Sequence, residues 1–175
     1  MTTNSTARLF VGLFPDNVVR DQLAAWRDAW TWPRSATPVA AGRLHLTLHF
    51  IGDVEIERVP EIAAALPGPF SSFALQLDRA LLWPHGVAVL EPEHAPAALI
   101  ALHAATGAML QRLGLPRDAR PYRPHVTLAR RAAGAGPPPA RPAIAWSIDR
   151  YALMQSTLGP GGQYSQVREI INQEK

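Results

Sequence analysis

The chain has 175 residues, of which 47% are hydrophobic, so it is long enough to bury a core and its length is typical of one domain. It contains no cysteine, which excludes disulfides, zinc–thiolate clusters and thiol nucleophiles. The 17 Lys and Arg outnumber the 14 Asp and Glu by a net charge of +3, a basic bias that suits a phosphate-bearing ligand but identifies none.

The first half of the chain predicts an alternation of strands and helices. Residues 8–14 form an apolar, β-favouring run closed by Pro15. The next segment has apolar residues at helical spacing up to Trp30, with Asp16 or Asn17 as its cap. The elements predicted after it are a strand over residues 44–51, a helix over 55–66 and a strand over 73–78.

The second half begins again with a short apolar strand that ends at a proline, Pro92. The elements predicted here are a strand over residues 86–91, a helix over 93–113 ended by Gly114, a strand over 125–129, a surface loop over 134–142, and closing strands over 144–155 and 164–171 around a turn at 159–162.

Both halves have the same order of strand, proline, acidic residue, helix and strand, which indicates an internal duplication. The period is too long for a solenoid, so the two copies are expected to pack as similar lobes about an approximate two-fold axis. We therefore predict an α+β fold in which residues 1–175 form one domain of two pseudo-symmetric lobes. Two mostly antiparallel sheets should line a central groove, with helices on the outer faces.

Two of the six histidines begin the same four-residue pattern, His-Leu-Thr-Leu in the first half and His-Val-Thr-Leu in the second. Residues i and i+2 of a strand share a face, so His45 lies beside Thr47 and His125 lies beside Thr127. The leucine that follows each threonine turns inward and sets the register. The two-fold axis should bring both imidazoles and both hydroxyls to the same groove.

Two imidazoles across a groove can divide the proton transfers of phosphodiester hydrolysis, because an ordinary pKa near 6.5 allows one to be neutral and the other charged. The neutral imidazole takes a proton from the attacking water, and the protonated imidazole donates to the leaving ribose oxygen. The hydroxyls of Thr47 and Thr127 can bond the non-bridging phosphate oxygens. This chemistry requires no metal. The pattern does not say which histidine is the acid.

The segments that contain these motifs, and two further segments, resemble the 2H phosphoesterase superfamily, in particular its bacterial branch of RNA 2′,3′-cyclic phosphodiesterases, also called 2′-5′ RNA ligase-like proteins. The segments are residues 8–15, 45–52, 122–130 and 159–164. The resemblance implies a bilobal fold, no cofactor and hydrolysis of the cyclic end to a 2′-phosphomonoester. It also implies that His45 is the proton donor to the 3′ oxygen and that His125 is the proton acceptor from water.

Other residues near the motifs have two possible roles each. Arg130 could bind a phosphate bidentately, but strand parity places it on the opposite face unless the strand bulges. Tyr122 could stack on a base or pack at the strand edge. Arg123 shares the parity of His125, although Pro124 makes its geometry uncertain. His49 shares the groove face by parity, either contacting a catalytic group or packing at the core edge.

The remaining histidines and the clustered tryptophans fit structural roles better than catalytic ones. These residues are His85, His94, His103, Trp26, Trp30 and Trp32.

The predicted partner is RNA with a 2′,3′-cyclic phosphate end, or a small cyclic nucleotide. We expect no obligate protein partner and a monomer, because two lobes supply both half-sites. The polar N-terminal segment and the absence of any apolar run of about 18 residues predict a cytoplasmic protein without membrane attachment.

Three alternative functions use the same residues differently. In ATP-independent 2′-5′ RNA ligation, the 5′-hydroxyl of a second RNA would replace water. A non-catalytic module would bind phosphorylated RNA ends, but it would have no need of two titratable groups at matched positions. A histidine metal site is disfavoured because each motif supplies too few ligands.

Overall fold

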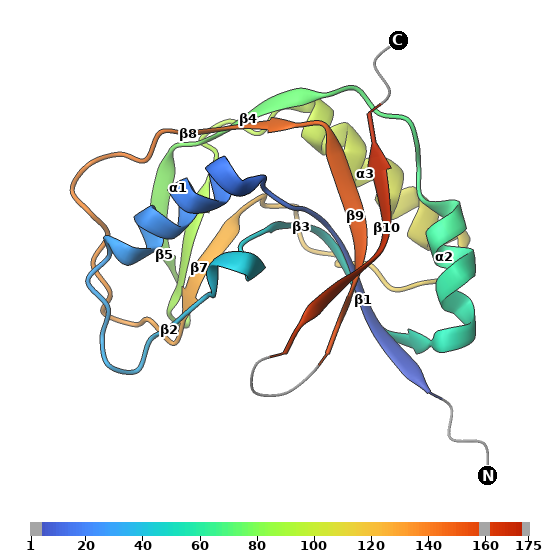
Figure 1. Cartoon of the computed structure of the whole chain (residues 1–175), viewed down its shortest axis with the longest axis horizontal. Helices are drawn as coiled ribbons and strands as arrows, with labels where there is room; N and C mark the ends of the chain where they lie inside the picture. The colour runs from blue at the N-terminus through green and yellow to red at the C-terminus, as the bar shows by residue number, and fades with distance from the viewer. Residues whose placement is uncertain (1–4, 158–161, 173–175) are drawn as a thin grey trace.

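A computed structural model describes residues 5–157 and 162–172, and Figure 1 shows the arrangement of its elements. The helices are α1 (Asn17–Asp28), α2 (Val59–Ala65) and α3 (Ala97–Arg112), with 3-10 helices η1 (Ala41–Arg43) and η2 (Ile56–Arg58). The strands are β1 (Thr6–Leu13), β2 (Thr37–Pro38), β3 (Leu46–Glu55), β4 (Phe73–Leu77), β5 (Arg79–Trp83), β6 (Val87–Glu91), β7 (Val126–Arg130), β8 (Ile144–Ile148), β9 (Arg150–Ser156) and β10 (Tyr164–Ile171).

One antiparallel sheet runs through both halves of the chain, in the order β10-β9-β1-β3-β7-β6-β5, with β2 paired to β7. Strands β4 and β8 form a second sheet of two strands. The prediction of an α+β fold with antiparallel sheets is confirmed. We call β10-β9-β1-β3 the first lobe and β7-β6-β5 with β2 the second lobe. The two lobes are joined where Leu46 of β3 pairs with Val126 of β7.

Each long helix packs against strands from the other half of the sequence (Figure 1). Helix α1 contacts β7 and β8, and α3 contacts β3. The N-terminus of α1 is capped by Asp16, whose carboxylate accepts a hydrogen bond of 2.9 Å from the backbone N–H of Val19. Buried side chains from both halves form one continuous apolar cluster, so the halves share a core. None of the helices in the described part of the chain is long and apolar enough to cross a membrane.

The strand predicted over residues 144–155 is in fact two strands in different sheets. Strand β8 pairs with β4, and β9 pairs with β1. The break falls at Asp149, and neither β8 nor β9 nor the residue between them is a glycine or a proline. The sequence therefore contains no turn signal at the point where the chain passes from one sheet to the other.

Other differences concern elements that were missed or begin later than predicted. Strands β2 and β5 lie where no element was predicted. The helix predicted over residues 55–66 begins only at Val59, because β3 continues to Glu55, and the helix predicted from residue 93 begins after Pro96. The predicted turn at 159–162 lies outside the described residues, apart from Gly162.

Strand β3 contains a β-bulge inside its histidine motif. In its pairing with β1, Gly12 lies opposite Thr47 and Val11 lies opposite His49, so Leu48 is an extra residue on β3. A bulge reverses the alternation of faces beyond it. Consequently His49 is only 5% exposed, whereas Phe50 is 56% exposed. The prediction that His49 shares the face of His45 is wrong, because it assumed an unbroken alternation, which would also have buried Phe50.

Strand β7 contains a bulge at the corresponding residue of the second motif. In its pairing with β6, Val89 lies opposite Thr127 and Ala88 lies opposite Ala129, so Leu128 is the extra residue. The motif leucine is thus a bulge residue in both lobes. The internal repeat that the sequence indicates extends to this local irregularity of the backbone.

Candidate functional site

The two motifs and their flanking residues repeat one pattern of burial, from residue 43 to 50 and from residue 123 to 130. In both copies the histidine and the threonine are half-buried, the apolar residues beside them are buried, and the first and last residues are exposed. Each lobe therefore supplies an imidazole and a hydroxyl in the same setting.

A backbone carbonyl two residues before each histidine fixes its tautomer. Nδ1 of His45 lies 2.7 Å from the carbonyl oxygen of Arg43, and Nδ1 of His125 lies 2.8 Å from that of Arg123. Because a carbonyl oxygen only accepts, Nδ1–H donates in both histidines. The second ring nitrogen, Nε2, is left to exchange protons in both.

The pairing of β3 with β7 brings the motifs together. Leu46 and Val126, which lie opposite each other, are both fully buried, so the residues on either side of each present the other face of the sheet. In the first motif, Nε2 of His45 lies 3.0 Å from Oγ1 of Thr47. The imidazole of His125 is near enough to His45 for a positive charge on His125 to lower the pKa of His45.

Aromatic rings surround His45. The ring of Phe14 stacks on it at 5.2 Å between centroids, and Phe10 and Tyr164 lie at 5.0 and 5.3 Å. Burial lowers the pKa of His45 below 6.5, and the hydrogen bond to the carbonyl of Arg43 opposes that shift. His45 therefore lies in apolar surroundings that favour its neutral form.

His125 has a different neighbourhood, which combines one aromatic ring with a carboxylate. The ring of Trp83 lies 4.3 Å from His125 between centroids. Burial lowers the pKa of His125, whereas the carbonyl of Arg123 and the negative charge of Glu91 raise it. The carboxylate makes the surroundings of His125 electrostatically unlike those of His45.

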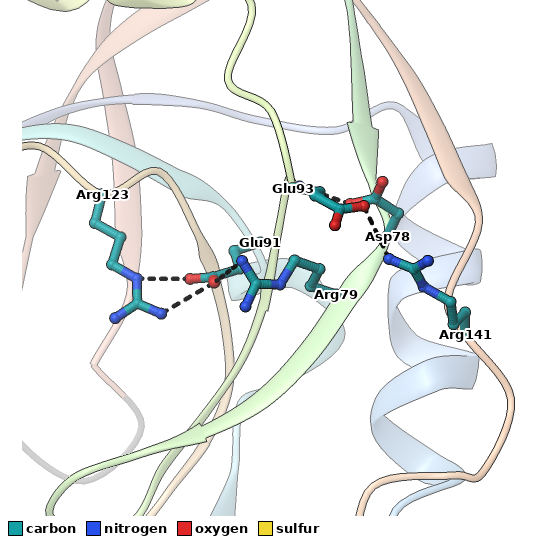
Figure 2. Close-up of polar contacts among 6 residues, drawn as sticks. All are labelled: Asp78, Arg79, Glu91, Glu93, Arg123 and Arg141. Atoms are coloured by element: carbon teal, nitrogen blue, oxygen red, sulfur yellow. Dashed lines mark hydrogen bonds and ion pairs between the residues drawn. The ribbon is translucent and has the colours of Figure 1, made fainter.

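Glu91 is a buried carboxylate held between two arginines. It is 3% exposed and accepts two hydrogen bonds from Arg123, of 2.8 and 3.0 Å, while Arg79 lies at 3.6 Å. Figure 2 shows the Glu91 carboxylate with Arg123 on one side and Arg79 on the other. The guanidinium of Arg123 also lies 4.4 Å from the ring of Trp83. Glu91 thus holds Arg123 in place. The carbonyl of Arg123 binds Nδ1 of His125, and its guanidinium packs against Trp83, the ring beside His125.

Arg130 lies on the site face because of the bulge at Leu128. Without the bulge, strand parity would place Arg130 opposite His125. Its positive charge lowers the pKa of both His45 and His125, so it is close to each of them. The structure therefore brings Arg130 together with the two histidines.

Three other predicted site residues are engaged elsewhere. The hydroxyl of Tyr122 donates to the carbonyl of Thr47 at 3.3 Å, and its ring stacks on His103 at 3.8 Å between centroids. His49 lies on the far side of β3, with its Nε2 donating to the carbonyl of His103 at 2.8 Å. The side chain of Arg123 is occupied by Glu91. These contacts agree with the prediction that Tyr122 packs at the strand edge and His49 at the edge of the core. The contacts of His49 are with His103 and not with the motif histidines.

The stack of His49, His103 and Tyr122 joins α3 to the back of the first motif. The rings of His49 and His103 lie 4.1 Å apart between centroids. Burial, together with the charges of His49 and Arg117, lowers the pKa of His103 to about 4. Burial also lowers the pKa of His49, so both histidines of the stack favour the neutral form and serve as packing groups.

No three side chains of His, Asp or Glu gather closely enough to hold a metal ion within residues 5–157 and 162–172.

The sequence model of the family described as the 2′-5′ RNA ligase superfamily matches residues 14–160 of this chain, a range that includes both histidine motifs. The chain belongs to this superfamily. The family resemblance indicated by the motifs is therefore confirmed.

Relatives in this superfamily match most of the chain. The RNA 2′,3′-cyclic phosphodiesterase of Escherichia coli is 35% identical over 155 residues, which cover 86% of this chain and 85% of that protein. The RNA 2′,3′-cyclic phosphodiesterase of Thermus thermophilus is 30% identical over 184 residues, covering 93% and 88%. The crystal structure of E. coli LigT in apo form superposes with a TM-score of 0.86 at 29% identity, covering 97% and 99%.

Sequence reasoning considered Arg123 but missed three other groups beside the motif histidines: Arg43 and Phe14 beside His45, and Glu91 beside His125. A repeated signal for them was available. An arginine stands two residues before each motif histidine, and Phe14 and Glu91 each stand directly before the proline that closes the first strand of their half. Their correspondence becomes meaningful only once the pairings of β1 with β3 and of β6 with β7 place them beside the histidines.

Proposed function

We propose that this protein hydrolyses the 2′,3′-cyclic phosphate at RNA ends, or on small cyclic nucleotides, to a 2′-phosphomonoester. The observation that carries the proposal is the matched pair His45 and His125. A carbonyl holds each imidazole in the same tautomer and leaves its Nε2 free for proton transfer, and the paired strands β3 and β7 place a threonine two residues after each histidine. Two relatives named RNA 2′,3′-cyclic phosphodiesterase support the choice of substrate.

Hydrolysis needs one proton acceptor and one proton donor on opposite sides of phosphorus. In the proposed reaction, Nε2 of His125 accepts a proton from water as the water oxygen bonds to phosphorus. The bond from phosphorus to the 3′ oxygen breaks, and Nε2–H of His45 protonates that oxygen. The phosphate remains on the 2′ oxygen. This assignment of donor and acceptor follows the family resemblance.

The charges of the site fit a cycle that begins when substrate binds. Burial lowers the pKa of both histidines in the free protein, which favours neutral imidazoles. A bound phosphate brings a negative charge that favours protonation of an adjacent imidazole. We assign Thr47, Thr127 and Arg130 to the non-bridging oxygens, where hydroxyl and guanidinium donors stabilise the charge of the transition state.

Turnover of a 2′,3′-cyclic nucleotide is expected to continue undiminished in excess EDTA and to release only the 2′-phosphate isomer. The two imidazoles supply both proton transfers, and the strained cyclic ester already holds its leaving group in place. Chromatography against authentic 2′- and 3′-monophosphates identifies the product.

Two outcomes of this experiment would contradict the proposal. A 3′-phosphate product would show that the other ester bond breaks, so the leaving-group assignment would be wrong. Activity lost in EDTA and restored by a divalent ion would overturn the two-histidine mechanism. A mixture without enzyme serves as the control for spontaneous opening of the ring.

Replacing Glu91 with Gln is expected to move the acid limb of the pH profile of kcat/KM to lower pH by about one unit. The carboxylate raises the pKa of His125, so its loss lowers that pKa, and the remaining charges of Arg123 and Arg130 act in the same direction. As the proton acceptor, His125 must be neutral, so its titration sets the acid limb.

This variant also tests which histidine is the acceptor. Movement of the basic limb instead would make His125 the donor, and an unchanged profile would mean that Glu91 does not act on His125. Glu93→Gln is the matched control, because Glu93 is the nearby carboxylate that pairs with Arg141 at 2.9 Å in Figure 2. The profile of this control should match that of the unmodified protein.

A further inference from the structure

Arg43 and Arg123 occupy equivalent positions in the two lobes, but their side chains have different partners. Each arginine stands two residues before its motif histidine and offers its carbonyl oxygen to Nδ1 of that histidine. The guanidinium of Arg123 is bound to the buried carboxylate of Glu91. Among the described residues, the guanidinium of Arg43 meets the hydroxyl and the ring of Tyr164 instead of a carboxylate. The described part of the chain therefore neutralises one arginine of the pair and leaves the charge of the other uncompensated.

Tyr164 holds the side chain of Arg43 at the surface of the first lobe. Nη2 of Arg43 donates to the hydroxyl of Tyr164 at 3.3 Å, and the guanidinium carbon lies 4.7 Å from the centroid of that ring. Tyr164 in turn packs edge-on against Phe10 at 4.9 Å between centroids. Because its oxygen accepts from Arg43, its own O–H can donate to a further acceptor. A guanidinium and a hydroxyl, both donors to phosphate oxygens, are thus held side by side.

This pair of donors lies next to His45. The ring of Tyr164 lies 5.3 Å from the ring of His45 between centroids, so a single ring separates the guanidinium of Arg43 from the imidazole. The positive charge of Arg43 also lowers the pKa of His45. The side chain of Arg43 is exposed. A ligand that occupies the groove at His45 can therefore reach the guanidinium with a second anionic group.

The proposed reaction indicates which anionic group this is. His45 protonates the 3′ oxygen, and the attacking water lies in line on the opposite side of phosphorus, beside His125. The ribose therefore lies on the His45 side. In an RNA strand, the 5′ oxygen of that same ribose carries the next phosphate. The free arginine thus stands on the side to which the strand continues, whereas the neutralised arginine, Arg123, stands on the side where water enters.

We propose that Arg43, held by Tyr164, binds the phosphate on the 5′ oxygen of the terminal nucleotide, so that the site prefers an RNA end to a mononucleotide. This proposal rests on the proposed function and adds the contact that distinguishes a strand from a single nucleotide. A contact with a backbone phosphate carries no sequence information, so the preference holds for every base. Because Arg43 is exposed, added salt weakens the contact.

The unmodified protein is expected to prefer the dinucleotide ApA with a 2′,3′-cyclic phosphate end to adenosine 2′,3′-cyclic phosphate, which has no phosphate on its 5′ oxygen. Arg43→Gln keeps the carbonyl that binds His45 and removes the charge. It should lower kcat/KM about tenfold for the dinucleotide and less than about twofold for the mononucleotide. The preference of the unmodified protein should decrease as sodium chloride is added, and that of Arg43→Gln should not.

Arg112→Gln is the matched control, because it removes an exposed arginine from the last turn of α3. It should keep the preference of the unmodified protein. Equal losses with both substrates in Arg43→Gln would overturn the proposal, because they would mean that Arg43 acts on His45 or on the fold. Unchanged turnover of the dinucleotide would overturn it as well.

A third substrate, adenosine 2′,3′-cyclic phosphate with a 5′-phosphate, separates the two sources of this phosphate. In Arg43→Gln it should lose as much kcat/KM as the dinucleotide, because both substrates carry a phosphate on the same oxygen. A loss confined to this mononucleotide would overturn the preference for RNA.

Binding of the reaction products distinguishes this proposal from the proposed function. Calorimetry compares 2′-AMP with the dinucleotide ApA that carries a 2′-phosphate. If the unmodified protein hydrolyses no cyclic phosphate, the proposed function fails. The assignment of Arg43 is still supported if Arg43→Gln weakens binding of the dinucleotide alone, and it is overturned if both ligands lose affinity equally or neither does.

Discussion

His45→Ala and His125→Ala should each lower kcat for a 2′,3′-cyclic nucleotide by at least about a hundredfold, the usual scale for loss of one acid–base group. The variant that lacks both histidines should be little slower than either single variant. The two imidazoles act in one reaction, so removing the second costs little when the first is already gone. Steady-state rates of all four proteins provide the comparison.

The control for this series is His94→Ala, because His94 is an exposed histidine outside both motifs. It should retain full activity, and circular dichroism should show that all variants keep their secondary structure. Losses that multiply in the double variant would mean that the histidines do not act in one step. A single variant with nearly full activity would remove that histidine from the mechanism.

The alternation of residues along a strand was enough to predict which motif side chains share a face. It placed His45 with Thr47 and His125 with Thr127, and the structure brings both pairs to the same side of one sheet. The duplication predicted that the two motif strands would meet. These inferences succeed because a buried face constrains the register of a strand over short distances.

The same alternation failed beyond the motif leucines, where the bulges reverse it. A bulge depends on how a strand pairs with its neighbour, and that neighbour lies far away in the sequence. The faces of His49 and Phe50 therefore could not be predicted from β3 alone. One sign of a bulge was present in the second copy. Arg130 stands at the end of the motif, where a functional side chain is expected, yet an unbroken alternation would place it on the opposite face.

The carboxylate that acts on His125 could not be predicted from the sequence either. Glu91 ends a short apolar strand and resembles an ordinary residue at a strand end. Its burial and its hydrogen bonds to Arg123, 32 positions later, depend on the pairing of β6 with β7. Long-range pairing of this kind determines which carboxylate acts on which histidine, and no local pattern reports it.

Arg130→Met should lower kcat by about a hundredfold, the scale for removing one donor that stabilises transition-state charge. The bulge at Leu128 places the guanidinium on the site face, where it lowers the pKa of both histidines. Its removal should therefore raise both of those pKa values and move both limbs of the pH profile of kcat/KM to higher pH. A purely structural loss would lower activity without moving the limbs.

Two further variants make the Arg130 prediction specific. Arg130→Lys keeps the charge but not the planar fork, so it should recover only part of the lost activity while the limbs stay near their original pH. Arg131→Met is the matched control, because the guanidinium of Arg131 binds Oγ1 of Thr37 at 2.6 Å. If Arg130→Met loses no more activity than Arg131→Met, Arg130 does not bind the phosphate, and the bulge at Leu128 serves only the packing of β7.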